Sequence, residues 1–169
     1  MNTFEAILTR RSIRKYTDKS IDEKTQKKLL QAAMQAPSAR DTQAWQFVVI
    51  NDRQTLQDIS NFHPYADMLK HAPLAIAVCG DFQLEENVDY LALNCAAVTE
   101  NILLAAHSFG LGAVWLAIYP RKQRIKELRN LLELPEDIIP ISLVAIGHTR
   151  ESKGSEDRFN AEKIHNNRW

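Results

Sequence analysis

The sequence predicts one domain in which helices and strands alternate. Four apolar runs have the length and composition of buried strands, and helical patterns of apolar residues lie between them. The longest helical pattern, residues 88–109, is apolar on nearly all sides. Such a helix must be buried at the centre of the domain or against a partner subunit, and we expect both. With 169 residues the chain is long enough for one domain with a real core and too short for two ordinary domains.

The charge balance limits the partners that the chain is expected to have. Lysine plus arginine and aspartate plus glutamate each number 21, so the formal net charge is zero. A neutral chain has no general attraction for nucleic acid or an anionic membrane, and any basic cluster must act locally. No apolar run reaches the ~18 residues of a membrane span, and the first residues lack the core of a signal peptide. We therefore expect a cytoplasmic protein that binds no nucleic acid and no membrane.

A short helix is predicted at the N-terminus. Asn2 and Glu5 have the spacing of a capping pair. Phe4, Ile7 and Leu8 continue the pattern as an apolar stripe on one helical face. The helix is expected to end where the first basic residues begin.

A cluster of three arginines follows this helix. Arg10, Arg11 and Arg14 place three guanidinium groups within five residues, with the hydroxyl of Ser12 among them. Like charges this close repel, which favours an anion between them, and a planar guanidinium suits phosphate better than an ammonium group does. The local sequence equally allows a simpler interpretation, in which a basic helix end gains a little from the helix dipole.

The other helices and strands are bounded by capping residues, prolines and glycines. Asp22 and Asp52 are N-cap candidates, and Gly110 has the conformational freedom that ends a helix. Helices are expected from residue 22 to the proline at 37, from 52 to 59, from 88 to 109 and from 121 to 132. Strands are expected at residues 46–50, 74–79, 113–119 and 138–146.

Two segments outside these elements have features of covers or anchors. Residues 61–69 form an irregular, aromatic-bearing stretch, which we interpret as a candidate cover over a pocket. The tail, residues 149–169, begins with the flexible composition of residues 151–157. It then carries aromatic residues, including Phe159 and Trp169, which a merely disordered tail does not need. We expect it to dock on its own domain or on a neighbouring chain.

Several common kinds of site are absent from the sequence. There is no nucleophile elbow and no phosphate-binding P-loop. Gly110-Leu111-Gly112 follows a helix and precedes a strand, the reverse of the order in a dinucleotide-binding motif. The two cysteines, Cys79 and Cys95, lie in apolar runs and are interpreted as reduced core residues. Five scattered histidines lack the spacing of a helical zinc site, so no metal site is expected.

Polar islands at the edges of apolar strands remain as candidates for a site. They are Arg10–Arg14, Ser38–Gln43, Leu116–Ile118 and Arg158. None of them contains an obvious acid, base or nucleophile. This pattern is typical of a protein that holds a reactive cofactor and leaves the covalent chemistry to it.

Taken together, four motifs make the chain similar to the nitroreductase family. They are Arg10–Tyr16, Ala36–Trp45, Gly110–Leu116, and Arg158–Phe159 continuing to His165 and Trp169. They occur in the family's order, and the resemblance covers essentially the whole chain. It implies an α+β fold of three layers, α/β/α, with a central mixed, largely antiparallel sheet. It also implies an intertwined homodimer with two FMN sites at the subunit interface, in which tail residues 149–169 dock on the partner subunit.

The resemblance assigns roles to the basic cluster. Arg10, Arg11 and Ser12 would hold the FMN phosphate and ribityl chain, with Arg158 closing on the phosphate. Arg14 would lie near the pyrimidine edge of the flavin, where a fixed positive charge stabilises the reduced ring. No side chain is obliged to act as a general acid.

Two other segments would complete the cofactor site by the same resemblance. The second subunit would contribute Pro37, Ser38, Ala39 and Asp41, with Gln43 ordering their loop. Backbone groups around Leu116, Ala117 and Ile118 would approach the edge of the flavin from the dimethylbenzene ring to N5.

Three positions depart from the family pattern. Asp41 replaces the usual asparagine, which exchanges an amide for a charged acceptor that could weaken flavin binding or pair with Arg40. Ala44 replaces a usual proline and should loosen the loop slightly. Ala117 stands where many relatives have glycine, and its methyl group could narrow the pocket.

The resemblance implies an FMN-dependent oxidoreductase. It would take hydride from NADH or NADPH onto flavin N5 and then reduce a nitroaromatic compound, a quinone or a similar small acceptor in the same pocket, by a ping-pong mechanism. Two alternatives stay open. One is a flavin-dependent enone reductase or metabolite dehydrogenase, and the other is a flavin-binding or redox-sensing protein without physiological turnover. The sequence identifies neither the natural acceptor nor the preferred nicotinamide.

Overall fold

The computed structural model describes all residues, 1–169, as five α-helices around a four-stranded sheet. The helices are α1 (Thr3–Thr9), α2 (Glu23–Ala33), α3 (Arg53–Phe62), α4 (Val88–Ser108) and α5 (Lys122–Leu131). The strands are β1 (Trp45–Ile50), β2 (Leu74–Asp81), β3 (Gly112–Ala117) and β4 (Ile138–Gly147). The predicted α+β class is confirmed.

The sheet has the strand order β1-β2-β4-β3, and every pair of neighbouring strands is antiparallel. The expectation of a mixed sheet is therefore wrong for the four strands themselves. The single parallel pairing is an isolated bridge between Ser12 and Ala113 on the outer edge of β3. A mixed sheet needs a further full strand beside β3, and here that place holds only one bridge.

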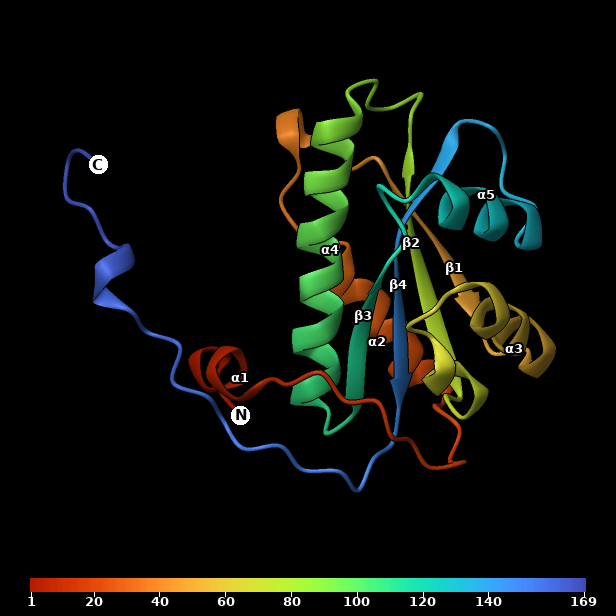
Figure 1. Cartoon of the computed structure of the whole chain (residues 1–169), viewed down its shortest axis with the longest axis horizontal. Coiled ribbons are helices and arrows are strands. Elements are labelled where there is room, and N and C mark those ends of the chain that lie inside the picture. The colour runs from red at the N-terminus through yellow and green to blue at the C-terminus, as the bar shows by residue number, and fades with distance from the viewer.

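Helices cover both faces of the sheet and give three layers (Figure 1). Helices α2 and α4 pack on one face, where the core includes Leu29, Ile76 and Val98. Helices α3 and α5 pack on the other, around Ile59, Leu128 and Leu143. Alternate residues of the strands supply the two cores, as expected for a sheet that is buried on both sides.

Local capping signals set the helix starts where the sequence predicts them. The Asn2 side chain accepts a hydrogen bond from the Glu5 N–H at 2.9 Å, which confirms the capping pair. Asp22 and Asp52 cap α2 and α3 in the same way. Gly110, with φ of 73°, follows the last turn of α4, in the left-handed region that favours glycine.

Helix α4 is the central helix of the domain. It is long and apolar enough to cross a membrane by length and composition, which corrects the expectation that no segment reaches that length, but here it packs on the sheet as a core helix. Gly80 of β2 permits the close approach, because a Cβ at this position would lie 2.2 Å from the Leu91 side chain. Leu91, Cys95, Val98 and Ile102 are buried, whereas Tyr90, Leu93 and Phe109 are exposed, so a single chain does not cover the helix on all sides.

The C-terminal ends of β2 and β3 differ from the prediction by two residues each. Strand β3 ends at Ala117, two residues early, because the N–H groups of Ile118 and Tyr119 both donate to the carbonyl of Ile141. Strand β2 instead extends to Asp81, which pairs with β4.

Residues 61–69 are more ordered than the sequence indicates. Asn61 and Phe62 close α3, and a short 3-10 helix, η2, spans Asp67–Lys70. His63 and Leu69 are buried in the core on the α3 side. A role of this segment as a pocket cover stays a prediction.

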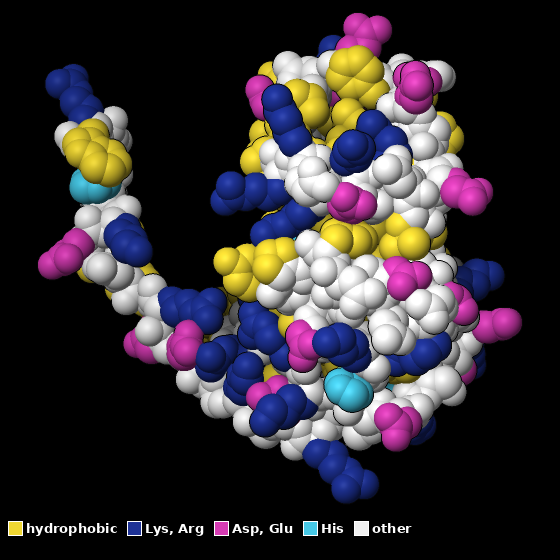
Figure 2. All heavy atoms as spheres, turned by 45° about the vertical axis from the view of Figure 1, so that its right-hand side comes forward, with side chains coloured by type: hydrophobic (Ala, Val, Ile, Leu, Met, Phe, Trp, Pro, Cys, Tyr) yellow, Lys and Arg dark blue, Asp and Glu magenta, His cyan; other side chains and the backbone are white.

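The tail leaves the body of the molecule beyond β4 (Figure 1). Its last nine residues are exposed, and the ring of Trp169 stacks on His165 with centroids 4.1 Å apart. Figure 2 shows the tail standing away from the body, with Lys and Arg side chains gathered where it departs. Phe159 and Ile164 of the tail are also exposed.

Candidate functional site

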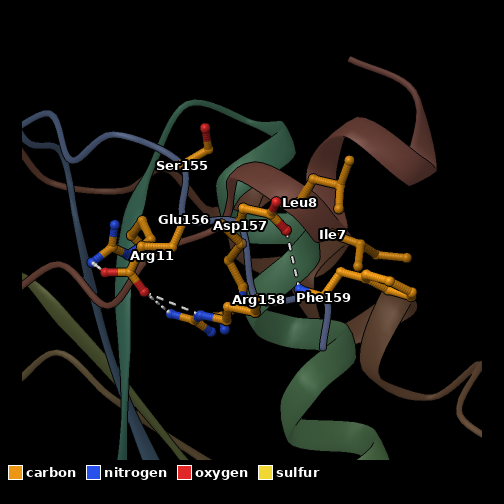
Figure 3. Close-up of a pocket in the computed structure, with 9 residues that line it drawn as sticks. Ile7, Leu8, Arg11, Ser155, Glu156, Asp157, Arg158 and Phe159 are labelled. Atoms are coloured by element: carbon orange, nitrogen blue, oxygen red, sulfur yellow. Dashed lines mark hydrogen bonds and ion pairs between the residues drawn. The ribbon is translucent and has the colours of Figure 1, made fainter. Parts of the chain in front are cut away.

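A cavity of about 520 Å³ lies between α1, the arginine cluster and the tail. Helix α1 contributes the apolar side chains of Ile7 and Leu8, and the tail contributes residues 155–159 (Figure 3). Arg10 and Arg11 complete the lining. One wall is therefore apolar and the other carries three guanidinium groups, including that of Arg158.

Two of these guanidinium groups converge on one carboxylate. Glu156 accepts hydrogen bonds from Arg158, at 2.8 Å from Nη2 and 3.1 Å from Nε, and lies 2.6 Å from Arg11 Nη2 (Figure 3). The hydrogen bonds from Arg158, and then the charge of Arg11, lower the pKa of Glu156. Arg11 also donates to the carbonyl oxygen of Gly154. Residues from opposite ends of the chain thus form a site that already holds an anionic group.

Arg10 has unused hydrogen-bonding capacity. Its Nε lies 3.2 Å from Oε1 of Glu100 on α4, close enough for an ion pair. The geometry does not make a hydrogen bond, and this buried Nε has no partner. Arg10 also lines the cavity, but this Nε is buried beside Glu100, so an anionic ligand would meet the rest of its guanidinium group.

The N-terminal segment is fixed along the edge of β3. The Ile13 N–H donates to the Ala113 carbonyl at 3.0 Å, and Lys153 Nζ donates to the Ser12 carbonyl at 2.8 Å. Gly112 makes room for this contact, because a Cβ there would lie 2.6 Å from the Ile13 side chain. The arginine cluster is thereby tied to the sheet and to the tail.

Arg14 lies apart from the other arginines. Its side chain is exposed and does not line the cavity, and its backbone N–H points to Glu151 at 3.5 Å. Its predicted position beside the flavin ring stays a prediction.

The predicted contacts of strand β3 lie at its C-terminal end. Leu116 and Ile118 are buried in the core on the α3 and α5 side, whereas Ala117 is exposed. Ala113, which pairs with Ser12 of the arginine cluster, lies four residues before Ala117 on the same strand. At about 3.3 Å per residue the two are roughly 13 Å apart. The edge of β3 from Ala113 to Ala117 therefore begins beside the arginine cluster.

The predicted loop contacts lie against the N-terminal half of α4. The Ser38 hydroxyl accepts from the Gln43 N–H at 3.0 Å, and the Gln43 amide donates to Asp41 at 3.0 Å. The Ala39 N–H donates to Asn94 of α4 at 2.9 Å. Pro37 is exposed at the start of this loop.

Arg40 does not pair with Asp41, which corrects one alternative drawn from the sequence. It binds both carboxylate oxygens of Glu85, at 2.7 and 2.8 Å. The Glu85 side chain is fully buried and requires a counter-charge. Arg40, Asp41 and Gln43 all have positive φ, from 48° to 56°, so the loop is held in a conformation that these residues rarely adopt.

The single chain brings together only part of the predicted site. Arg10, Arg11 and Arg158 meet in the cavity, and Ser12 lies next to them at the edge of β3. No residue of the loop 37–43 or of the β3 end 116–118 lines that cavity.

Sequence reasoning missed the partners of these residues. Glu156, Glu100 and Lys153 all contact the arginine segment, and nothing local distinguished them from other surface charges. The spacing of Glu156 two residues before Arg158 is the one signal that could have been used. His63 and Arg124, which bind the Ala117 carbonyl, were also missed.

The cysteines behave as the sequence predicts. Cys79 and Cys95 are buried and unpaired. Burial raises the pKa of each thiol to about 12, so both stay protonated and poorly nucleophilic at neutral pH.

Comparisons with known proteins identify the family. Residues 7–63 and 59–148 match the model described as the Nitroreductase family. A Methanothermobacter thermautotrophicus protein with the provisional name NADH dehydrogenase/NAD(P)H nitroreductase is 45% identical over 169 residues, covering 100% of this chain and 88% of the relative.

Solved structures agree with this match. A Parabacteroides distasonis protein with the same provisional name has a TM-score of 0.96 at 40% identity, with 100% of both chains covered. An FMN-dependent nitroreductase from Clostridium difficile R20291 has a TM-score of 0.90 at 29% identity, covering 98% of this chain and 99% of that one. The family predicted from the four sequence motifs is confirmed, and the chain belongs to the nitroreductase family of oxidoreductase enzymes.

Proposed function

We propose that this protein is an FMN-dependent oxidoreductase that passes reducing equivalents from NADH or NADPH to a small planar acceptor, such as a nitroaromatic compound or a quinone. The observation that carries the proposal is the convergence of Arg11 and Arg158 on one carboxylate. A phosphate group has the charge and the acceptor oxygens to replace that carboxylate. The C. difficile relative, whose name includes FMN, supports the choice of cofactor.

The side chains of the cavity would bind and orient the cofactor. Arg11 and Arg158 would hold the phosphate, and the guanidinium group of Arg10 would add a third positive charge to the lining. The hydroxyl of Ser12 would support the phosphate and ribityl chain. FMN, when bound, would supply the centre that accepts and donates hydride.

The remaining predicted contacts require a second subunit. We propose a homodimer in which the loop 37–43 of one chain completes the site on the other, and in which the tail, residues 149–169, docks on the partner subunit. Exposed apolar side chains on α1, α4 and the tail, among them Phe4, Leu93 and Trp169, provide the surface for this contact. A cytoplasmic location completes the proposal.

One pocket would serve both substrates in turn. The nicotinamide would leave before the acceptor enters, which is a ping-pong sequence. Within such a pocket the residues of this chain orient the reactants and exclude competing reactions, which is where proximity contributes most to the rate.

The test is an absorbance spectrum followed by two additions. Purified wild-type protein, supplied with FMN and freed of excess, should be yellow. Under anaerobic conditions NADH or NADPH should bleach the flavin band, and a nitrofuran or a quinone should restore it. A protein that stays colourless after incubation with FMN contradicts the proposal. Size-exclusion chromatography with light scattering tests the dimer separately.

A further inference from the structure

The carbonyl oxygen of Ala117 is held by two donors from different helices. Arg124 of α5 donates from Nη1 at 2.8 Å, and the ring Nε2 of His63, just after α3, lies at 3.1 Å. His63 is almost completely buried, with 1% of its surface exposed. A surface carbonyl at the end of an edge strand normally bonds to water, so two side chains committed to one oxygen are unusual.

The proton position on His63 follows from its neighbours. The backbone N–H of Tyr65 donates to Nδ1 at 3.2 Å, so Nδ1 carries the lone pair. Nε2 must then carry the proton and donate to the Ala117 carbonyl. Burial lowers the pKa of His63, which favours this neutral form.

Arg124 is fixed by a second contact. Its guanidinium carbon lies 5.5 Å from the centroid of the Tyr65 ring, in cation–π geometry. The Tyr65 ring in turn meets the His63 ring edge to face, with centroids 6.3 Å apart. His63, Tyr65 and Arg124 therefore form one packed unit around the Ala117 carbonyl, which we call the Ala117 clamp.

The clamp acts on the open edge of the sheet. Backbone groups of successive residues in a strand point to opposite sides. Ala113 turns its carbonyl outward to Ile13, and Ile118 and Tyr119 donate inward to β4, so Trp115 and Ala117 also face outward. Both are exposed. A ligand lying along this edge would meet the N–H and carbonyl groups of Trp115 and the N–H of Ala117, because the clamp occupies the Ala117 carbonyl.

We propose that His63 and Arg124 are positioning residues of the flavin site. They hold the Ala117 carbonyl so that this end of the β3 edge presents the Ala117 N–H and a positive charge, and no free carbonyl at Ala117, to the ring of the cofactor. This inference rests on the proposed function, because it requires a flavin beside Ala117. Reduction adds negative charge to the flavin, so a fixed cation and bound carbonyl stabilise the reduced form.

The test measures the two-electron midpoint potential of bound FMN in wild type and variants. Arg124→Gln keeps a donor and removes the charge, and His63→Leu removes the second donor. Each should shift the equilibrium at least tenfold towards oxidised flavin, equivalent to about 30 mV for a two-electron couple. Arg124→Lys and His63→Gln, which keep a donor near the carbonyl, should restore most of the potential.

The matched control is Lys126→Gln, which removes a positive charge from an exposed position of α5. Its potential should equal that of the wild type. Unchanged potentials in both Arg124→Gln and His63→Leu, with FMN bound, would overturn the clamp alone and leave the proposed function standing. Wild-type protein that binds no FMN would overturn both. If His63→Leu does not fold, the Arg124 pair decides the question.

Discussion

Two arginine–glutamate contacts in this protein differ in how firmly they are held. In the tail, Glu156 is half exposed and bridges Arg11 and Arg158. In the loop before β1, Arg40 binds a Glu85 side chain that is fully buried and also accepts from the Asn87 N–H at 3.0 Å. The first carboxylate can leave its arginines for water, whereas the second cannot. The first contact therefore marks a place where an outside anion can enter, and the second holds a loop in shape.

Removing an arginine from the tail contact should have the largest effect, and it should act on binding. Arg158→Ala or Arg11→Ala removes charge-assisted hydrogen bonds to the phosphate, each worth about 1.5–3 kcal/mol, or roughly 10- to 150-fold in FMN affinity. Quenching of flavin fluorescence measures the change. Lys122→Ala, at an exposed position of α5 outside the cavity, is the control and should bind as the wild type does. If all three variants retained FMN equally, the assignment of Arg11 and Arg158 to the phosphate site would be wrong.

Removing the buried carboxylate should instead act on stability. Glu85→Gln weakens the bond to Arg40 and releases a loop that contains three residues with positive φ. We expect a drop of several degrees in the melting temperature, and a smaller loss of FMN affinity than the loss of Arg11 or Arg158 causes, because the loop holds no part of the phosphate site. Glu86→Gln, an exposed neighbour, is the matched control. A melting temperature equal to the control would show that Glu85 does not hold the loop.

Lowering the pH should weaken both contacts, but it should reduce the stability of the fold by different amounts at the two sites. Hydrogen bonds from Arg40 lower the pKa of Glu85, and those from Arg158 lower that of Glu156, relative to the ordinary value of 4.5. The unfolded chain then binds more protons than the folded one below about pH 4.5, so stability is present above that pH and is lost as the pH falls through the folded pKa.

Urea unfolding at a series of pH values measures this loss. The slope of stability against pH below about 4.5 should be shallower in Glu85→Gln than in the wild type. Glu156→Gln should change it little, because its contact lies in the exposed tail. The opposite ranking would mean that the tail contact, and not the loop contact, supports the fold.

The smallest expected effect is a gain of affinity. Glu156→Gln removes the carboxylate that competes with phosphate for Arg11 and Arg158. Exposed ion pairs are individually weak, so FMN should bind only roughly two- to fivefold more tightly. Asp157→Asn, at the next position, is the control for charge alone. Weaker binding in Glu156→Gln would show that this carboxylate organises the arginines and does not compete.

Features that depend on neighbouring residues in sequence were predictable. The caps at Asn2, Asp22 and Asp52 and the helix end at Gly110 follow from local hydrogen bonding and backbone freedom. The four strands were placed to within two residues, because their apolar runs are continuous. The family and its fold came from motifs, whose order carries more information than any one of them.

Features that depend on distant residues were not predictable. Arg40 finds its partner 45 residues away in a buried Glu85, and no local pattern marks that carboxylate as buried. The positive φ of Arg40, Asp41 and Gln43 is imposed by tertiary contacts, since these residues do not require it. A mixed, largely antiparallel sheet was expected, and the four strands are all antiparallel. Strand direction is set by the path of the connections, which local sequence does not reveal.

The short pairing of the arginine segment with β3 has a consequence for solubility. An edge strand with unpaired backbone groups is a template on which another chain can add a strand and aggregate. Here the bridge between Ser12 and Ala113 covers one end of the β3 edge, and His63 and Arg124 occupy the carbonyl at the other. Only the outward groups of Trp115 and the Ala117 N–H stay open between them, a stretch too short to seed a new strand.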